Sequence, residues 1–506
     1  MKTNTSETYS IPSFIKTRPK TKIVCTLGPA TKSISSIKQL IKSGMSVARI
    51  NLSHGNIKDH INLIKNARTA SKEINFPLAI LADIPGPKYR INVKDSKDID
   101  LQNGLTIHLF NDQNKKITKQ HNIWPSGFIE NLKIGSKLIV DDGSIELKLE
   151  EKNNQSIICK VTSGGILKDN KSITAPGNTS SINYFSKETL EAIDFVKSSD
   201  VDYIGLSFIR DSSDLTSIKD KLMGIKNPPK LISKIEIQQA VKNLNEIINN
   251  SDGVMVARGD LGVEMPFEKV PEVQKRIIKL ANKYGKPVIT ATQMLESMID
   301  KPNPTRAEVT DIHNAVIDGT DAVMLSGETS IGKHPIKSVK AMAKIAKTSE
   351  KYLDTNNIAN RRDNFIHQNK NLDIDDAIAL SSCNLSNSIQ SKAVFAFTES
   401  GSTASRVASF RPKAPIIALC SSYEVCINLC LNWGIIPIKV KNFTRVQDMF
   451  REGSKIAIET KLAKTNDLIV VVLGLPIGQP GNTNLLRVIV IPEIENNSIN
   501  FGYGAF

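Results

Sequence analysis

A lysine and two carboxylates in the middle of the chain have a spacing that suits phosphate chemistry. Lys234 and Glu236 lie two positions apart at the end of the β-forming run Lys230–Ile235, and Asp260 follows the next such run, Gly253–Ala257. Side chains two positions apart on a strand point to the same side. Mg²⁺ typically takes one or two carboxylates and fills its remaining positions with water and substrate oxygens. An ammonium beside such a cation stabilises a transferring phosphoryl group, so the pattern predicts a phosphoryl-transfer site.

Polar residues also follow other strand-like runs, so the predicted site draws on several parts of the chain. An arginine such as Arg49 grips a phosphate through two parallel hydrogen bonds. Residues Gly259–Gly262 look like a turn that enters a helix, whose free N–H groups would bind a carboxylate or phosphate. The other polar residues at strand ends are Asn51, Ser53, His54, Asp83, Thr292, Ser326 and Glu328. Each has an ordinary structural interpretation when taken alone, and His54 suits a capping role as well as a phosphate contact.

The elements that must position these residues alternate between strand and helix. Eight strand-like runs, each followed by a helical pattern, favour a closed (β/α)8 TIM barrel over an open doubly wound sheet. The runs are Lys22–Thr26, Ser46–Asn51, Leu78–Asp83, Tyr203–Phe208, Lys230–Ile235, Gly253–Ala257, Pro287–Thr292 and Ala322–Ser326. Catalytic groups in such barrels sit at the C-terminal ends of the strands, which is where the polar residues fall.

The alternation has one long interruption and one continuation, which predict the domain organisation of this α/β protein. Short runs rich in Val and Ile, separated by turn signals, indicate an all-β lid domain after the third strand. A patternless polar stretch indicates a linker before a smaller α/β regulatory domain. The expected boundaries are a flexible segment at 1–19, the barrel at 20–86 and 183–353, the lid at 87–182, the linker at 354–371 and the C-terminal domain at 372–506.

Composition excludes several classes of protein. The 506 residues carry a net charge of +15, but the 66 basic residues are spread out, whereas a nucleic-acid module concentrates them among aromatics. No apolar run approaches the roughly 20 residues of a membrane-spanning helix. The six cysteines contain no Cys-x-x-Cys motif and suit buried thiols. We expect neither a nucleic-acid nor a membrane partner. The polar N-terminus predicts a cytoplasmic protein, with an organellar transit peptide as the alternative.

Seven stretches of this sequence together resemble the pyruvate kinase family. They are TKIVCTLGPAT (21–31), VARINLSHG (47–55), LISKIE (231–236), SDGVMVARGDLGVE (251–264), GKPVITATQMLESMI (285–299), PTRAEV (304–309) and DGTDAVMLSGET (318–329). They occur in the family's order and spacing, and the β insertion stands in the family's place. The resemblance implies that the chain converts phosphoenolpyruvate and ADP into pyruvate and ATP, with a lid that closes over the site and excludes water.

The resemblance also implies a role for each matching residue. Glu236 and Asp260 would hold Mg²⁺ or Mn²⁺, Lys234 would stabilise the phosphoryl group, and Arg49 would bind the substrate phosphate. The substrate carboxylate would lie on the backbone at Gly259 and Asp260 and on the Thr292 hydroxyl. Thr292 and Ser326 would help to deliver the proton that yields pyruvate. The residues implied on the nucleotide side are Arg90, Lys171, Asn51 and His54.

Two stretches depart from the family pattern. Asn51, Ser53, Asp83 and the Ile84 carbonyl match the family's K⁺ ligands, but Lys88 stands where K⁺-dependent members usually have Glu. A tethered ammonium would replace a mobile cation there, so we expect no K⁺ requirement. The second departure is Lys171–Gly177, where the family usually reads Lys-Gly-Val-Asn-Leu-Pro-Gly. Its changed residues are Ser172, Thr174 and Ala175.

A hydroxyl-rich loop in the C-terminal domain suggests an effector site. Thr398, Ser400, Gly401, Ser402 and Thr403 precede a helical stretch, and such a loop forms either a phosphate cradle or an ordinary helix cap. In this family the matching loop holds an effector phosphate. Glu399 stands where members that respond to fructose-1,6-bisphosphate often have Lys, so we expect a sugar monophosphate or AMP instead. The resemblance further implies a homotetramer.

Two other functions remain compatible with these residues. One is another Mg²⁺-dependent phosphoenolpyruvate or pyruvate barrel that works without ADP. The other is a catalytically impaired regulatory member of the same family. The lid insertion and Lys234 argue against the first, and the presence of Lys234, Glu236, Asp260 and Arg49 argues against the second.

Overall fold

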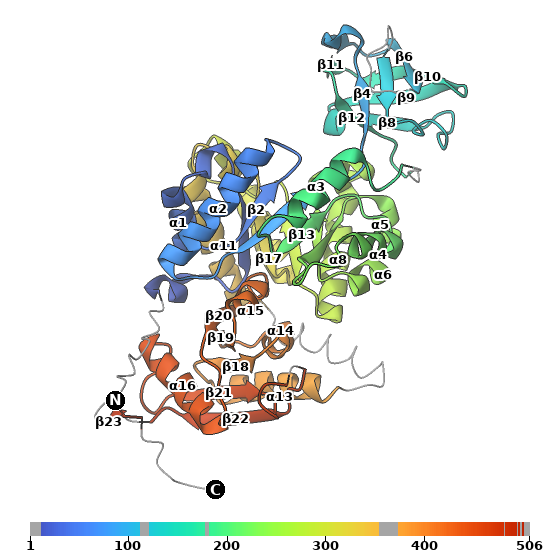
Figure 1. The fold of residues 1–506 in the computed structure, drawn as a ribbon. Helices are drawn as coiled ribbons and strands as arrows, with labels where there is room; N and C mark the ends of the chain where they lie inside the picture. The colour runs from blue at the N-terminus through green and yellow to red at the C-terminus, as the bar shows by residue number, and fades with distance from the viewer. Residues whose placement is uncertain are drawn as a thin grey trace.

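The chain has three folded parts (Figure 1): a central barrel, a smaller β-domain at one end of it and an α/β domain at the other. The computed structural model describes residues 12–111, 121–177, 182–353, 373–479 and 481–492, and the backbone of β23 (Ile494–Glu495) and β24 (Ser498–Ile499). The expected linker at 354–371 and the first 11 residues of the expected flexible segment lie outside this part of the chain.

Eight parallel strands close into the central barrel, which confirms the TIM-barrel prediction. Their spatial order is β1-β17-β16-β15-β14-β13-β3-β2, and closure comes from β1, which pairs with β2 on one side and β17 on the other. The strands are β1 (Lys22–Thr26), β2 (Met45–Asn51), β3 (Ala79–Ile84), β13 (Tyr203–Leu206), β14 (Lys230–Ile235), β15 (Gly253–Ala257), β16 (Val288–Ala291) and β17 (Ala322–Leu325). They are buried almost throughout, as expected of parallel strands that are covered on both faces.

An outer ring of helices covers the barrel because each presents an apolar face to the strands. In α8 (Val270–Tyr284), for example, Ile277, Ile278 and Ala281 are buried on one side. The other barrel helices are α1 (Ile34–Ser43), α2 (Ile57–Ile74), α3 (Lys187–Lys197), α4 (Ser212–Lys221), α5 (Gln238–Lys242), α6 (Leu244–Asn250), α7 (Arg258–Glu264), α9 (Arg306–Asp318), α10 (Gly327–Ser330) and α11 (Pro335–Ser349). Gly259–Gly262, expected to form a turn that enters a helix, already lie inside the short helix α7, with Asp260 in its first turn.

The lid is a second closed β-barrel with its own apolar core. Its strand order is β10-β6-β7-β4-β12-β8-β9, and a two-stranded sheet of β5 and β11 lies beside it. The strands are β4 (Tyr89–Asn92), β5 (Ile99–Leu101), β6 (Thr106–Asn111), β7 (His121–Trp124), β8 (Lys137–Val140), β9 (Ile145–Lys152), β10 (Ser156–Ser163), β11 (Gly165–Leu167) and β12 (Lys171–Thr174). The chain leaves the large barrel after β3 and returns before α3, so two short connections form the hinge.

The C-terminal domain is a five-stranded sheet in the order β20-β19-β18-β21-β22 with helices beside it. All its neighbouring strands run parallel except the edge strand β22. The strands are β18 (Val394–Thr398), β19 (Ile416–Cys420), β20 (Ile435–Lys439), β21 (Leu468–Leu473) and β22 (Leu485–Val490). The helices are α13 (Ile374–Ser388), α14 (Ser402–Ser409), α15 (Tyr423–Asn428) and α16 (Val446–Glu459).

Short 3-10 helices complete the described secondary structure. They are η1 (Ser13–Thr17), η2 (Pro29–Thr31), η3 (Lys94–Ser96), η4 (Asp141–Gly143), η5 (Phe267–Lys269), η6 (Glu296–Ile299) and η7 (Glu350–Tyr352). Within the described residues, no helix has the length and apolar character needed to cross a bilayer. All six cysteines are buried and free.

Segments from both ends of the chain close the floor of the large barrel. Residues 12–19 belong to the segment expected to be flexible, yet Arg18 donates hydrogen bonds to the carbonyl oxygens of Gly44 at 2.8 Å and Met45 at 2.6 Å. From the C-terminal domain, Ile427, Cys430 and Leu431 pack against the apolar residues at the bottom of the barrel. The C-terminal domain therefore covers the floor of the barrel, at the end opposite the lid (Figure 1).

Candidate active site

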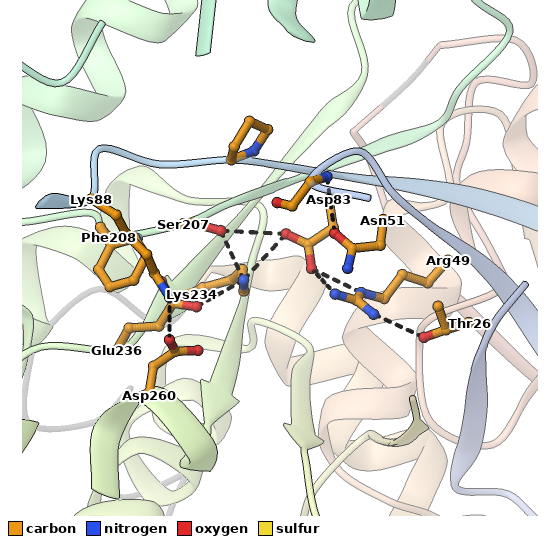
Figure 2. A network of polar contacts seen from close by, with 12 residues as sticks. Thr26, Arg49, Asn51, Asp83, Lys88, Ser207, Phe208, Lys234, Glu236 and Asp260 are labelled. Carbon is orange, nitrogen blue, oxygen red and sulfur yellow. Dashed lines mark hydrogen bonds and ion pairs between the residues drawn. The ribbon is translucent and has the colours of Figure 1, made fainter. Parts of the chain in front are cut away.

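Lys234 is the centre of a buried polar network at the C-terminal rim (Figure 2). Its ammonium lies 2.7 Å from Glu236 Oε1, 2.8 Å from Ser207 Oγ and 3.2 Å from Asp83 Oδ1. The network combines the end of β14 with β3 and the residue after β13, so three barrel strands must be in register to build it. Lys234 and Glu236, whose spacing predicts side chains on the same side of the strand, are thus in direct contact.

Arg49 extends the network through Asp83. From β2, its Nε donates a hydrogen bond to Asp83 Oδ2 at 2.8 Å, and its NH1 donates to Thr26 Oγ1 at 2.9 Å. Asp83 is 2% exposed and lies between two cations, because one of its oxygens faces Arg49 and the other faces Lys234. One carboxylate therefore holds both positively charged side chains in place.

Burial and mutual attraction shift the pKa values in this cluster. Burial alone would lower the pKa of Lys234, but Asp83, Glu236 and Asp260 outweigh it and raise that pKa. Burial works against ionisation of Asp83, but Lys234 and Arg49 hold its pKa below the usual value. Burial raises the pKa of Glu236 to about 7 despite the attraction of Lys234. Lys234 and Asp83 consequently stay charged across the physiological range.

Asp260 lies on α7 on the side of Lys234 away from Arg49, where Lys88 contacts it. Lys88 Nζ is 3.0 Å from Asp260 Oδ1 and 4.7 Å from the centre of the Phe208 ring. Figure 2 shows Lys88 across the site from Asn51, so the ammonium does not lie at the expected K⁺ ligands in this structure. Burial alone would raise the pKa of Asp260, but Lys88 and Lys234 lower it.

Glu236 and Asp260 offer a donor set that fits a divalent cation. Glu236 is fully buried, and its Oε2 accepts a hydrogen bond from the Phe208 N–H at 2.6 Å, which fixes the carboxylate. The described residues contain no cluster of three or more His, Cys, Asp or Glu side chains suited to a metal. Two carboxylate ligands suffice for Mg²⁺ or Mn²⁺ where substrate oxygens and water complete the shell.

Thr292 and Gly259 meet where β16 and α7 adjoin. The Thr292 hydroxyl accepts a hydrogen bond from the Gly259 N–H at 2.8 Å, and Thr292 has a φ of 66°. Arg258 fixes this strained turn, because its NH2 donates to the Thr292 carbonyl at 2.5 Å and its NH1 contacts Asp311 at 2.7 Å. A left-handed threonine is uncommon and persists only where neighbours hold it.

Ser326 follows β17 at the same rim. Its N–H donates a hydrogen bond to Glu328 Oε2 at 2.7 Å, and the other oxygen of this buried carboxylate accepts from the Leu295 N–H at 3.0 Å. Glu328 therefore ties the ends of β16 and β17 together and sets the place of Ser326.

The residues expected on the nucleotide side divide between the lid and the barrel. Arg90 NH1 donates to the Asn170 carbonyl at 2.9 Å beside a cavity of about 540 Å³, and Lys171 pairs with Asp141 at 2.8 Å. The barrel residues among them are Asn51, whose Oδ1 accepts from the Ser53 N–H at 3.2 Å, and His54, whose side chain is exposed. The structure does not bring the two groups together.

The expected effector loop follows β18 and opens α14. Thr398 Oγ1 accepts from the Gly401 N–H at 2.9 Å, and Gly401 has a φ of 93°, which favours glycine. Thr403 is buried against Thr483 at 2.9 Å, whereas Ser400 and Ser402 are 3.2 Å apart. A cavity of about 40 Å³ at the loop is lined by Ser400, Ser402, Glu399 and Lys441, among others.

Sequence reasoning missed three residues of the rim: Thr26, Ser207 and Phe208. Ser207 accepts a hydrogen bond from Lys234, and Phe208 contacts both Lys88 and Glu236. Phe208 has a φ of 57°, which ends β13 before the position predicted from its apolar run. A Ser-Phe pair after an apolar run does not mark a functional site in the sequence, because its contacts depend on how the strands align.

Family models match most of the chain. A model of the pyruvate kinase barrel domain matches residues 18–339, and one of the pyruvate kinase alpha/beta domain matches residues 376–489. The chain belongs to the pyruvate kinase family. Pyruvate kinase from Geobacillus stearothermophilus is 38% identical over 478 residues, which cover 94% of this chain and 81% of the relative. The pyruvate kinase of Staphylococcus aureus strain MRSA252 is 37% identical over 489 residues, 96% and 83% of the two chains.

A solved structure supports the same assignment. The crystal structure of a pyruvate kinase from Cryptosporidium parvum matches with a TM-score of 0.88 at 32% identity and covers 95% of this chain and 98% of that one. As a pyruvate kinase, the chain is a phosphotransferase, and its polar rim lies where barrel enzymes carry their chemistry.

Proposed function

We propose that this pyruvate kinase transfers the phosphoryl group of phosphoenolpyruvate to ADP with the help of Mg²⁺ or Mn²⁺ and without K⁺. The observation that carries the proposal is the Lys234 ammonium, which is held by Asp83, Glu236 and Ser207 beside Arg49. Such preorganised cations stabilise a transferring phosphoryl group without reorganising during the reaction.

Each rim residue then has a place in the reaction. Arg49 binds the substrate phosphate, and Lys234, which Asp83 and Glu236 hold in place, stabilises the phosphoryl group. Glu236 and Asp260 would hold the divalent cation, which would supply positive charge to neutralise the charge that develops. The backbone at Gly259 and Asp260 with the Thr292 hydroxyl receives the substrate carboxylate. The Gly259 N–H now donates to Thr292, so this hydrogen bond must open for the carboxylate to enter.

The proton that completes pyruvate comes from the other side of the rim. Thr292 and Ser326 follow the adjacent strands β16 and β17, and Glu328 and Arg258 fix their positions. Transfer of the phosphoryl group leaves an enolate, and protonation of its terminal carbon gives pyruvate. The two hydroxyls would pass that proton on while the lid, with Arg90 and Lys171 on the nucleotide phosphates, excludes water.

Pyruvate formation from phosphoenolpyruvate, ADP and Mg²⁺ in a buffer containing only Na⁺ tests the proposal. We expect a full rate in Na⁺, no product without ADP, and a loss of about 100- to 1000-fold in kcat for Lys234→Met. Lys137→Met removes an ammonium that pairs with Glu146 on the lid surface, and it should leave the rate unchanged. A rate that requires added K⁺ would refute the charge-replacement role of Lys88, and product without ADP would favour the enolate-chemistry alternative.

We further propose that the loop after β18 binds an effector with a single phosphate and that the chain forms a homotetramer. The Ser400 and Ser402 hydroxyls at the cavity support a phosphate site, and the Glu399 carboxylate beside them would repel a second phosphate. Ribose-5-phosphate or AMP should therefore activate more strongly than fructose-1,6-bisphosphate, and the opposite order would refute this. Sedimentation of the purified chain measures the oligomeric state.

A further inference from the structure

Lysines form one line along the outer face of α11 and the turn that follows it. This lysine stripe consists of Lys337, Lys340, Lys344 and Lys347 on α11 and Lys351 on η7, all of them exposed. The members are three or four residues apart, which is the spacing that places side chains above one another on a helix. The buried residues of α11, among them Val339, Met342 and Ala346, lie on the opposite side. The stripe therefore faces solvent along the whole helix.

The charge of the lysine stripe is not balanced by neighbouring acids. Neither α11 (Pro335–Ser349) nor the adjacent α1 (Ile34–Ser43) contains an aspartate or a glutamate, and α1 adds the exposed Lys42. Within the described residues, no carboxylate forms an ion pair with Lys337, Lys340 or Lys344. The nearby acids on α9 and η7 have other partners: Asp311 pairs with Arg258, Asp318 pairs with Lys275, and Glu350 accepts from the Thr21 N–H.

This arrangement opposes the helix that carries it. Like charges three or four residues apart on a helix repel each other, and every lysine of the stripe has such a neighbour. Lys337 also lies in the first turn of α11, where the helix dipole disfavours a cation and no acid is present. Glutamates at alternate positions would remove both effects. An uncompensated line of cations of this kind suits contact with a polyanion.

The lysine stripe fits the phosphate backbone of a nucleic acid better than a bilayer or an acidic protein. The fully described stretch from 337 to 351 contains no exposed large hydrophobic residue that could enter a lipid surface or anchor a protein interface. Lysines are point charges that bind phosphates without a fixed geometry. At about 1.5 Å per residue the stripe is about 21 Å long, which matches about six nucleotides at about 3.4 Å each.

An exposed aromatic ring lies at the end of the lysine stripe. Tyr352 follows Lys351 and is 73% exposed, and its ring meets His313 edge-on with the ring centres 6.2 Å apart. Proteins bind single strands through this combination, because bases stack on the ring while the backbone follows the charges. The basic residues are spread out along the sequence, which argued against a nucleic-acid partner, but the helix brings these five together.

We propose that the lysine stripe and Tyr352 form a binding surface for single-stranded RNA or DNA on the outer wall of the barrel. Backbone phosphates lie along the lysines, and a base stacks on Tyr352. Charge and stacking distinguish bases little, so the surface has no strong sequence preference. No residue of the stripe belongs to the polar network around Lys234, so the strand and the substrates bind at separate places.

Fluorescence anisotropy with a labelled RNA of about 12 nucleotides, and with the DNA of the same sequence, tests the proposal at about 50 and about 200 mM NaCl. We expect both strands to bind at the lower salt concentration and to bind about 100-fold more weakly at the higher one, as five phosphate contacts require. One variant combines Lys337→Gln, Lys340→Gln, Lys344→Gln and Lys347→Gln. Its affinity should fall by a factor of about 3 between the two salt concentrations, because one phosphate contact is left.

Tyr352 is tested separately, because its substitution leaves the charge unchanged. Tyr352→Ala should weaken binding about fivefold or more, whereas Tyr352→Phe keeps the ring and should bind as the wild type does. Loss of binding in Tyr352→Phe, or none in Tyr352→Ala, would refute the stacking contact.

A control variant removes the same charge from other parts of the surface. It combines Lys65→Gln, Lys226→Gln, Lys279→Gln and Lys413→Gln, all exposed residues outside the stripe. We expect it to retain the wild-type salt dependence, and both multiple variants to retain the melting temperature and the rate of pyruvate formation. Equal losses of strand binding in the two variants would mean that net charge alone attracts the strand, and this would refute the proposal. The absence of wild-type binding at the lower salt concentration, or stripe-dependent binding of anionic phospholipid vesicles without binding of either strand, would also refute it.

Discussion

Asp83 is the residue on which the active-site charges depend, because, in the part of the chain that the structure describes, it is the carboxylate that pairs with both Arg49 and Lys234. Asp83→Asn would leave two buried cations with one counter-charge fewer, and removal of one partner from a buried ion pair costs about 3–5 kcal/mol. We expect a clear fall in the melting temperature and a loss of most activity. Differential scanning calorimetry and the pyruvate assay measure the two effects.

Asp200 provides the matched comparison for that substitution. It also pairs with an arginine, Arg68, but its side chain is 72% exposed. Exposed pairs contribute about 0–1 kcal/mol, so Asp200→Asn should change the melting temperature little. Equal effects of the two substitutions would show that burial does not set the importance of Asp83.

The sequence predicts the charged residues of the site better than its neutral ones. Lys234, Glu236, Asp260 and Arg49 follow apolar runs, and parallel strands in a barrel bring such positions to one rim. Ser207 and Phe208 could not be predicted in this way, because a serine and a phenylalanine are common after a strand. Their contacts also depend on a left-handed turn that the sequence does not indicate. The position of Lys88 could not be predicted either, since a flexible lysine side chain can reach several carboxylates.

At the scale of the elements, the hinge after β3 packs against the loop after β13 with no room for a side chain. A Cβ added at Gly86 would lie 2.4 Å from the Ser207 carbonyl oxygen and 2.9 Å from the Phe208 ring. Gly86→Ala must therefore displace Ser207, whose hydroxyl accepts from Lys234. We expect a loss of about 1–3 kcal/mol in stability and a fall in kcat, measured by denaturant unfolding and the pyruvate assay.

Gly262 in α7 is the control for that substitution. The nearest atom to its added Cβ is Val270 Cγ2 at 4.0 Å, and its backbone is helical. Gly262→Ala should therefore retain both stability and activity. A Gly86→Ala variant that behaves in the same way would mean that the hinge gives way without moving Ser207.

The strands of the large barrel are predictable because they are continuous apolar runs between polar segments. Less of the C-terminal domain is predictable, and β20, α15 and α16 were not anticipated. β20 contains Pro437, which disfavours a strand inside a sheet, but the strand lies at the edge of its sheet, where proline is tolerated. Residues Gly259–Gly262 were expected as a turn that enters a helix, whereas the helix α7 already begins at Arg258.

At the scale of the whole molecule, the barrel floor and the C-terminal domain share a buried lysine. Lys22 on β1 donates a hydrogen bond to the Ile435 carbonyl, and burial, aided by the nearby Arg18 charge, lowers its pKa to about 8. In the unfolded chain this lysine keeps its proton up to about pH 10.4. Between these values the unfolded state binds more protons, so Lys22 makes the folded state more stable as the pH rises.

The difference in melting temperature between the wild type and Lys22→Met should therefore shift in favour of the wild type from about pH 8 to 10. Lys38→Met is the control, because Lys38 pairs with Glu73 at the surface and is 34% exposed. The difference in melting temperature between Lys38→Met and the wild type should stay constant from about pH 8 to 10. If the difference in melting temperature for Lys22→Met also stays constant over this pH range, the lysine keeps its proton in the folded state.

Closure of the large barrel by β1 and β17 has a consequence for synthesis on the ribosome. β1 can pair with β2 early, but its second partner, β17, is synthesised some 300 residues later, because Lys22 pairs with Ala322. Every strand of the lid, in contrast, lies between Tyr89 and Thr174. At 5–20 residues per second, translation from residue 174 to 325 takes roughly 8 to 30 s. We expect the nascent chain to carry a finished lid on an unfinished barrel, with the edge of β3 awaiting β13 throughout the first part of that interval.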